Sequence, residues 1–277
     1  PSLLYSESII KEQESQHEVM KILFVTPPPY LPNSLHRNRS FDLIRILAIK
    51  HEVHLLSVTT YKEEPKEFRE IKKVCKSVSI IYLNPLKAIL NCLRFPFLPA
   101  EVAYCYSSKA TKEIQKTIQR ENIDIVYFKR LRSAVYLDAS SDFTSKESRS
   151  LPRHLRGGSR IILDTTDAMS MFYKRLSNGS SFPKNIIYKL EEIKYKMFEQ
   201  KTMKKIKNWV VCSEIDQEYL QKFGADANIH VVPNPVDIDF FSSRYLSRPP
   251  RGSPFGHPRG AYLRDNSLLF RGLMDKP

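Results

Sequence analysis

The chain has 277 residues, 42% of them hydrophobic, and its 44 basic and 30 acidic residues give a net charge of +14. This hydrophobic fraction excludes global disorder, and the charge favours partners that carry phosphate groups. Only eight glycines occur, all at or beyond Gly157. The part of the chain before Gly157 therefore excludes the glycine-rich phosphate loops of dehydrogenases and P-loop nucleotidases.

Short apolar runs rich in β-branched residues predict buried strands. The predicted strands are 21–26, 53–58, 78–83, 123–128, 160–164, 209–212 and 229–232. Amphipathic segments between them predict helices over 40–50, 108–121, 186–207 and 213–223. In the third of these helices an apolar repeat has lysines on the other face; it comprises Ile186, Leu190, Ile193 and Met197. Strands that alternate with helices indicate an α/β fold, a Rossmann-like doubly wound parallel sheet.

Composition divides the chain into four parts. Residues 1–19 are a polar extension before Met20, and residues 20–243 carry the predicted sheet. An Arg- and Pro-rich linker follows at 244–266, and 267–277 contain one further apolar run. We interpret that run as the first strand of a truncated second domain.

The four cysteines have neither C-x-x-C spacing nor histidine partners at metal-ligand spacing. This pattern argues against a zinc site or a disulfide framework and favours a reducing, cytoplasmic setting. The apolar stretch 86–106 is interrupted by prolines and charged residues, so it does not predict a membrane-spanning helix.

Ligands of an open parallel sheet bind beyond the carboxyl ends of its strands. The loop after the first strand offers groups for a phosphate or carboxylate: Asn33, Ser34, Arg37 and Arg39. The basic residues after the fourth strand are Lys129, Arg130 and Arg132. The alternatives are a proline-stiffened connector for the first segment and a solvated charge run for the second.

Further polar residues follow the fifth and sixth strands. Asp164 and Asp167 form a carboxylate pair suited to acid–base chemistry or metal binding, although Asp and Thr are also common helix caps. Ser213 and Glu214 begin the next helix with a Ser-x-x-Asp pattern that resembles a capping box, so Ser213 is expected to be its N-cap. The lysine-rich segment 194–207 fits either a lipid-facing or a solvated helix face.

The order of these segments resembles the amino-terminal domain of family 4 glycosyltransferases of the GT-B fold. The similar segments are 20–27, 37–41, 51–56, 124–127, 162–170, 211–214, 231–237 and 269–275. The most specific of them, V-V-P-N-P-V-D at 231–237, resembles the V-P-N-G-V-D motif before the interdomain linker of these enzymes, with Pro235 in place of glycine. The last segment resembles the first strand of their donor-binding domain.

This resemblance implies one half of a GT-B architecture, in an enzyme that transfers a sugar from a nucleotide diphosphate sugar to a glycan or lipid-linked acceptor. Transfer would retain the anomeric configuration and use no metal or other cofactor. The implied catalytic residues are Asp164, Asp167 and Arg130. The implied acceptor and cleft residues are Asn33, Ser34, Arg37, Arg39, Lys129, Arg132, Ser213, Glu214 and Asn234. Because the nucleotide would be held mainly by the missing domain, we expect the chain alone to fold but not to transfer sugar.

Two other functions remain open. A basic module without catalysis would dock on an anionic membrane through 86–106 and the lysine-rich helix. Nucleic-acid binding has only the charge in its favour, without an aromatic platform or a groove-binding helix, so no nucleic-acid partner is expected. The predicted location is cytoplasmic, or peripheral on the inner membrane face, in polysaccharide or glycolipid biosynthesis.

Overall fold

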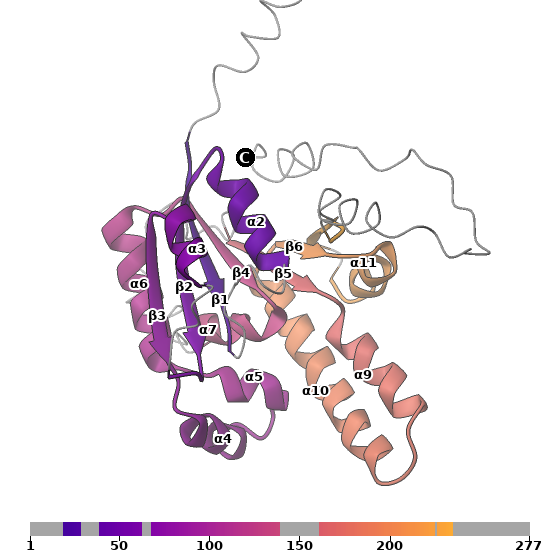
Figure 1. Cartoon of the computed structure of the whole chain (residues 1–277). Coiled ribbons are helices and arrows are strands. Elements are labelled where there is room, and N and C mark those ends of the chain that lie inside the picture. The colour runs from indigo at the N-terminus through magenta and orange to yellow at the C-terminus, as the bar shows by residue number, and fades with distance from the viewer. Residues whose placement is uncertain (1–18, 29–38, 63–67, 139–160, 225, 235–277) are drawn as a thin grey trace, which may run out of the picture. The chain divides into compact units, whose positions relative to one another are not determined.

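The computed structural model describes residues 19–28, 39–62, 68–138, 161–224 and 226–234 (Figure 1). They belong to two compact units, unit 1 (Pro1–Leu163) and unit 2 (Asp164–Pro277). The predicted linker 244–266, the predicted final strand 267–277 and residues 1–18 of the predicted extension lie outside the described residues.

The elements alternate between strand and helix. Unit 1 contains β1 (Lys21–Thr26), α2 (Arg39–Ala48), β2 (Glu52–Thr59), α3 (Phe68–Val74), β3 (Ser77–Tyr82), α4 (Pro85–Arg94), α5 (Ala100–Cys105), α6 (Ser108–Glu121), β4 (Ile125–Lys129), the 3₁₀ turn η1 (Leu131–Ala134) and α7 (Val135–Asp138). Strand β5 (Ile161–Thr166) contains the boundary between the units. Unit 2 continues with α9 (Met169–Asn178), α10 (Lys184–Lys205), β6 (Asn208–Val211), α11 (Glu214–Gln221) and β7 (Asn228–Val231).

The strands form a seven-stranded sheet in the order β3-β2-β1-β4-β5-β6-β7. Strand β1 pairs in parallel with β2 and β4, β2 pairs in parallel with β3, and β6 pairs in parallel with β7. Buried residues fill these strands, and the rings of Phe24 and Tyr127 stack with centroids 4.8 Å apart on neighbouring strands. The predicted α/β fold with a parallel sheet is confirmed.

The predicted strand bounds agree with the structure to within one or two residues, and β1 and α6 match them fully. Helices α3, α4, α5, α7 and α9 had no predicted counterpart. Among the described residues, no helix is long and apolar enough to cross a membrane.

The apolar repeat predicted for the long helix of unit 2 faces solvent and not the core. The predicted repeat Ile186, Leu190, Ile193 and Met197 is exposed along α10. The buried side of α10 instead consists of Glu191, Tyr195, Phe198, Glu199, Thr202 and Met203. Large apolar residues occur on both sides of the helix, since Tyr195, Phe198 and Met203 are buried while the predicted repeat is exposed. Periodicity alone therefore does not distinguish the inner side from the outer one.

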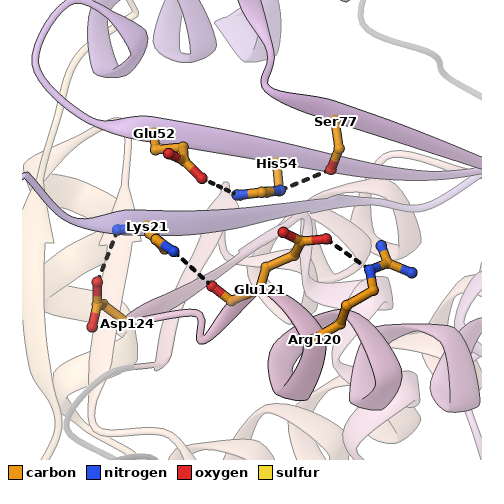
Figure 2. A network of polar contacts seen from close by, with 7 residues as sticks. All are labelled: Lys21, Glu52, His54, Ser77, Arg120, Glu121 and Asp124. Atoms are coloured by element: carbon orange, nitrogen blue, oxygen red, sulfur yellow. Dashed lines mark hydrogen bonds and ion pairs between the residues drawn. The ribbon is translucent and has the colours of Figure 1, made fainter.

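Polar contacts join two pairs of neighbouring strands near their amino-terminal starts in unit 1, β1 with β4 and β2 with β3 (Figure 2). The Asp124 carboxylate accepts a hydrogen bond from the Lys21 backbone N–H at 2.9 Å. The buried His54 ring has one nitrogen 2.7 Å from Ser77 Oγ and the other 3.0 Å from Glu52 Oε1. These contacts fix the register of the strands at the edge opposite to their carboxyl ends.

We expect Asp124→Ala to lower the free energy of unfolding by about 1 to 2 kcal/mol, because the Lys21 N–H loses a charged acceptor. Chemical denaturation measures the change. Glu121→Ala is the control: the Glu121 carboxylate pairs with Arg120 on the exposed surface, so its removal should leave the midpoint nearly unchanged. Equal midpoints for the Asp124 variant and the parent would contradict the role given to this contact.

Candidate functional site

The carboxyl end of β4 carries a strained basic turn. Lys129, the last residue of the strand, is buried, whereas Arg130 is exposed. The backbone of Arg130 has φ 69° and ψ 141°, a conformation that residues other than glycine rarely adopt. The carbonyl of Arg130 accepts hydrogen bonds from the backbone N–H and the hydroxyl of Ser133, at 3.0 and 2.7 Å. The turn therefore holds the Arg130 backbone in place and presents its side chain to solvent.

Arg132 lies two residues further on and is largely buried. Its Nη1 donates to Glu101 Oε2 of α5 at 2.8 Å, and only 13% of the side chain is exposed. Burial raises the pKa of the neighbouring Cys105 thiol to about 12, although the charge of Arg132 acts in the opposite direction. Burial also raises the pKa of the Tyr136 hydroxyl well above its ordinary value. Through its ion pair with Glu101, Arg132 holds α5 against the turn after β4.

The first predicted loop is only partly described. Arg39 begins helix α2 and is half-buried. Asn33, Ser34 and Arg37 lie outside the described residues. The role predicted for these four residues stays a prediction.

The turn after β5, in unit 2, is held by Asp164. The Asp164 side chain is fully buried, and its Oδ1 accepts hydrogen bonds from the Thr166 N–H at 3.1 Å and the Thr166 hydroxyl at 3.4 Å. Thr166 has φ 70°, which is unfavourable for a β-branched residue. Asp167 follows on the exposed surface. Of the two predicted carboxylates, Asp164 positions the turn and Asp167 is the one exposed to solvent.

Two carboxylates from distant segments cap the next helix, α9. Asp216 Oδ1 accepts from the Ala168 N–H at 2.9 Å, and Glu199 Oε1 accepts from the Ser170 N–H at 3.1 Å. The Ser170 hydroxyl donates to the other oxygen of Glu199. Because these carboxylates already use the amides at the start of α9, this helix end is poorly suited to bind a phosphate group.

Glu199 is the buried carboxyl group with a strongly altered pKa. Burial raises its pKa to about 7, and the nearby Asp216 acts in the same direction, whereas the hydrogen bonds from Ser170 oppose the increase. Its side chain is 1% exposed, so a substrate does not reach it. Glu199 therefore stabilises the start of α9 from its buried side.

The remaining predicted residues lie around the carboxyl ends of β6 and β7. Ser213 is the N-cap of α11, accepting from the Asp216 N–H at 3.2 Å, and its hydroxyl donates to the Asp216 carboxylate. Glu214 is exposed in the first turn of α11. Asn234 Oδ1 accepts from Cys212 Sγ at 3.3 Å. Through Asp216, Ser213 is connected to the turn that carries Asp167.

Three residues of these contacts had no predicted role: Glu101 in unit 1, and Ser170 and Glu199 in unit 2. Asp216 has a signal in the Ser213-x-x-Asp216 pattern, which is typical of a helix start. The contact from its carboxylate to Ala168 spans 48 residues and leaves no local pattern. Within the described ranges no group of three His, Cys, Asp or Glu side chains is arranged to hold a metal ion.

The sequence matches no family model and no curated protein. The chain is similar in structure to a UGT from Phytolacca americana complexed with UDP-2fluoro-glucose and pterostilbene, with a TM-score of 0.47, 13% identity and coverage of 83% of this chain and 58% of that chain. A sucrose-phosphate synthase from Thermosynechococcus elongatus gives a TM-score of 0.49, 11% identity and coverage of 83% and 53%. A UGT from Medicago truncatula complexed with UDP-glucose gives 0.43, 14%, 83% and 58%. The chain spans a little more than half the length of these three proteins.

Proposed function

We propose that the chain is the acceptor-side half of a glycosyltransferase that uses a nucleotide diphosphate sugar. The observation that carries the proposal is the pair of strained turns at Arg130 and Thr166, which directly follow two strands of the parallel sheet. Strain of this kind at non-glycine residues is concentrated at functional sites. The Thr166 turn lies within the segment 162–170, which resembles the glycosyltransferase family, and the Arg130 turn follows the similar segment 124–127.

Each turn presents a different chemical group. The exposed guanidinium of Arg130 suits the charge that develops on a leaving diphosphate, because preorganised positive groups stabilise such charge in the transition state. The exposed carboxylate of Asp167 suits a sugar hydroxyl of the acceptor. Lys129, Arg132 and Asp164 are buried or nearly so, and they position these two groups.

A transfer assay tests the proposal on two proteins: the 277-residue chain, and the same chain joined to the donor-binding domain of a glycosyltransferase of the GT-B fold. Both are incubated with radiolabelled nucleotide sugars and a membrane lipid extract, with UDP-sugars tested first. We expect labelled acceptor only with the longer protein, because the 277-residue chain supplies the acceptor side but not the domain that would hold the nucleotide. In the longer protein Asp167→Asn should lower the transfer rate by roughly a hundredfold.

Glu218→Gln is the matched control, because Glu218 is an exposed carboxylate of α11. It should leave the transfer rate unchanged. Absence of transfer by the longer protein with every nucleotide sugar tested would overturn the proposed function. Transfer by the 277-residue chain alone would overturn the assignment of donor binding to a second domain.

A second candidate function is a membrane-binding module without catalysis, which the exposed apolar side of α4 favours. The same assay separates the two functions, because a binding module transfers no sugar at any length.

A further inference from the structure

Helix α4 of unit 1 turns its apolar residues outward. Leu86, Ile89, Leu90 and Leu93 recur at helical spacing and are 71%, 56%, 60% and 76% exposed. Phe97, in the turn that follows the helix, is 87% exposed. We call these five residues the α4 stripe. An apolar stripe of this kind on the surface marks an interaction site.

The side of α4 that faces the protein carries small and polar residues instead. Ala88 is its only buried residue. Cys92 Sγ donates to the carbonyls of Ala88 and Ala100, at 3.6 and 3.5 Å, and Asn91 Nδ2 donates to the Tyr106 carbonyl at 3.0 Å. A surface helix normally buries its apolar side and exposes its polar one, so the orientation of α4 is reversed.

The charges along the α4 stripe have one sign. From Asn84 to Ala100 the charged residues are Lys87 and Arg94, both exposed, and no acidic residue occurs. Basic residues beside an outward row of Leu, Ile and Phe are typical of helices that lie in the interface of an anionic membrane. Pairing of the stripe with a second copy of itself would bring like charges together.

We propose that the α4 stripe docks on an anionic lipid bilayer. Its apolar side chains enter the boundary between headgroups and acyl chains, while Lys87 and Arg94 contact lipid phosphates. Helix α4 begins three residues after the carboxyl end of β3 and lies beyond the arrowheads of β2 and β3 in Figure 1. The docking surface is thus at the end of the unit 1 sheet where ligands of parallel sheets bind.

The position of the α4 stripe indicates the chemical class of the acceptor, an inference that rests on the proposed function. An acceptor that reaches the carboxyl edge of the sheet from the bilayer is a lipid-linked sugar or a glycolipid. The docking itself requires no sugar transfer.

Co-sedimentation with lipid vesicles tests the docking on the full chain, without any nucleotide sugar. We expect binding to vesicles of phosphatidylglycerol mixed with phosphatidylcholine, weaker binding in high salt, and little binding to phosphatidylcholine alone. Leu90→Gln with Leu93→Gln should lower the affinity by roughly tenfold or more, because two large side chains no longer enter the bilayer. Both positions are exposed, so circular dichroism should show an unchanged fold.

The matched control is Leu190→Gln with Met197→Gln on α10, where two large apolar side chains are also exposed. It should bind vesicles like the parent. Lys87→Gln with Arg94→Gln should weaken binding to the anionic vesicles by roughly tenfold, through loss of two phosphate contacts. In Phe97→Trp the new indole should shift its emission to the blue on vesicle binding, against the constant signal of the buried Trp209.

Three results would overturn the docking. They are absence of binding to the anionic vesicles, loss of binding in the α10 variant but not in the α4 variant, and a dimer that light scattering finds only when Leu90 and Leu93 are intact. The last result would assign the stripe to a second copy of the chain. Because the vesicle assay contains no nucleotide sugar, its failure is distinct from failure of the transfer assay.

Discussion

Glu199→Gln should abolish a loss of stability that we expect of the parent as pH rises from about 4.5 to about 7. The Glu199 carboxyl group is buried, and its burial raises its pKa from 4.5 to about 7. Between these two values the folded protein binds a proton that the unfolded chain has released. Stability therefore falls as pH rises through this range.

The full loss for this group is roughly 3 kcal/mol, the free-energy equivalent of its pKa increase. The glutamine side chain of the variant has the shape of the protonated carboxyl group and does not titrate. Its carbonyl oxygen can accept from the Ser170 N–H, so the cap of α9 survives. The variant should gain stability relative to the parent as pH rises, and the difference should be largest above the folded pKa of about 7.

Chemical denaturation of both proteins between about pH 5 and about pH 8 measures this difference. Glu218→Gln is the control for the substitution itself, because it makes the same change at a carboxylate that is exposed on α11. Glu199→Ala removes the cap as well as the charge, so it should be less stable than Glu199→Gln at every pH. A constant difference between Glu199→Gln and the parent would contradict the burial of the ionised group.

The sequence predicted the sheet well because its strands are marked by local composition. The run 21–26 is apolar and β-branched, and it forms β1 with the predicted bounds. The segment that forms α4 has the apolar spacing of an amphipathic helix, but this spacing alone does not show that its apolar side faces solvent. In α10 the predicted apolar repeat is periodic, but the side of the helix that is buried is determined by its contact with α9.

The candidate site was predictable only where its residues directly follow a strand. Arg130 and Asp167 do so, and their positions can be read from the order of the strands. The contact of Glu199 with Ser170 spans 29 residues and joins two helices. The strain at Arg130 and Thr166 also has no sequence signal, since neither residue is a glycine. Both features depend on how the elements pack.

Arg130→Gly should stabilise the protein and impair its function. The backbone of Arg130 lies in a conformation that costs a residue with a Cβ about 1 to 3 kcal/mol, and glycine avoids this cost. Part of the gain is lost because glycine makes the unfolded chain more flexible, so we expect a net increase in the free energy of unfolding of about 1 kcal/mol. In the longer protein that transfers sugar, loss of the guanidinium should lower the rate by roughly a hundredfold.

Arg130→Ala separates the backbone from the side chain. Alanine keeps the Cβ and therefore the strain, so its stability should match that of the parent, while its transfer rate should fall as far as that of Arg130→Gly. Asn122→Gly is the control for the backbone alone: Asn122 has φ 52° at the end of α6, and its substitution should leave transfer unchanged. If Arg130→Gly kept the parent rate, the strain would have no link to sugar transfer. If it destabilised the protein, the turn would depend on the arginine side chain for its shape, and the arginine would serve the fold in place of the reaction.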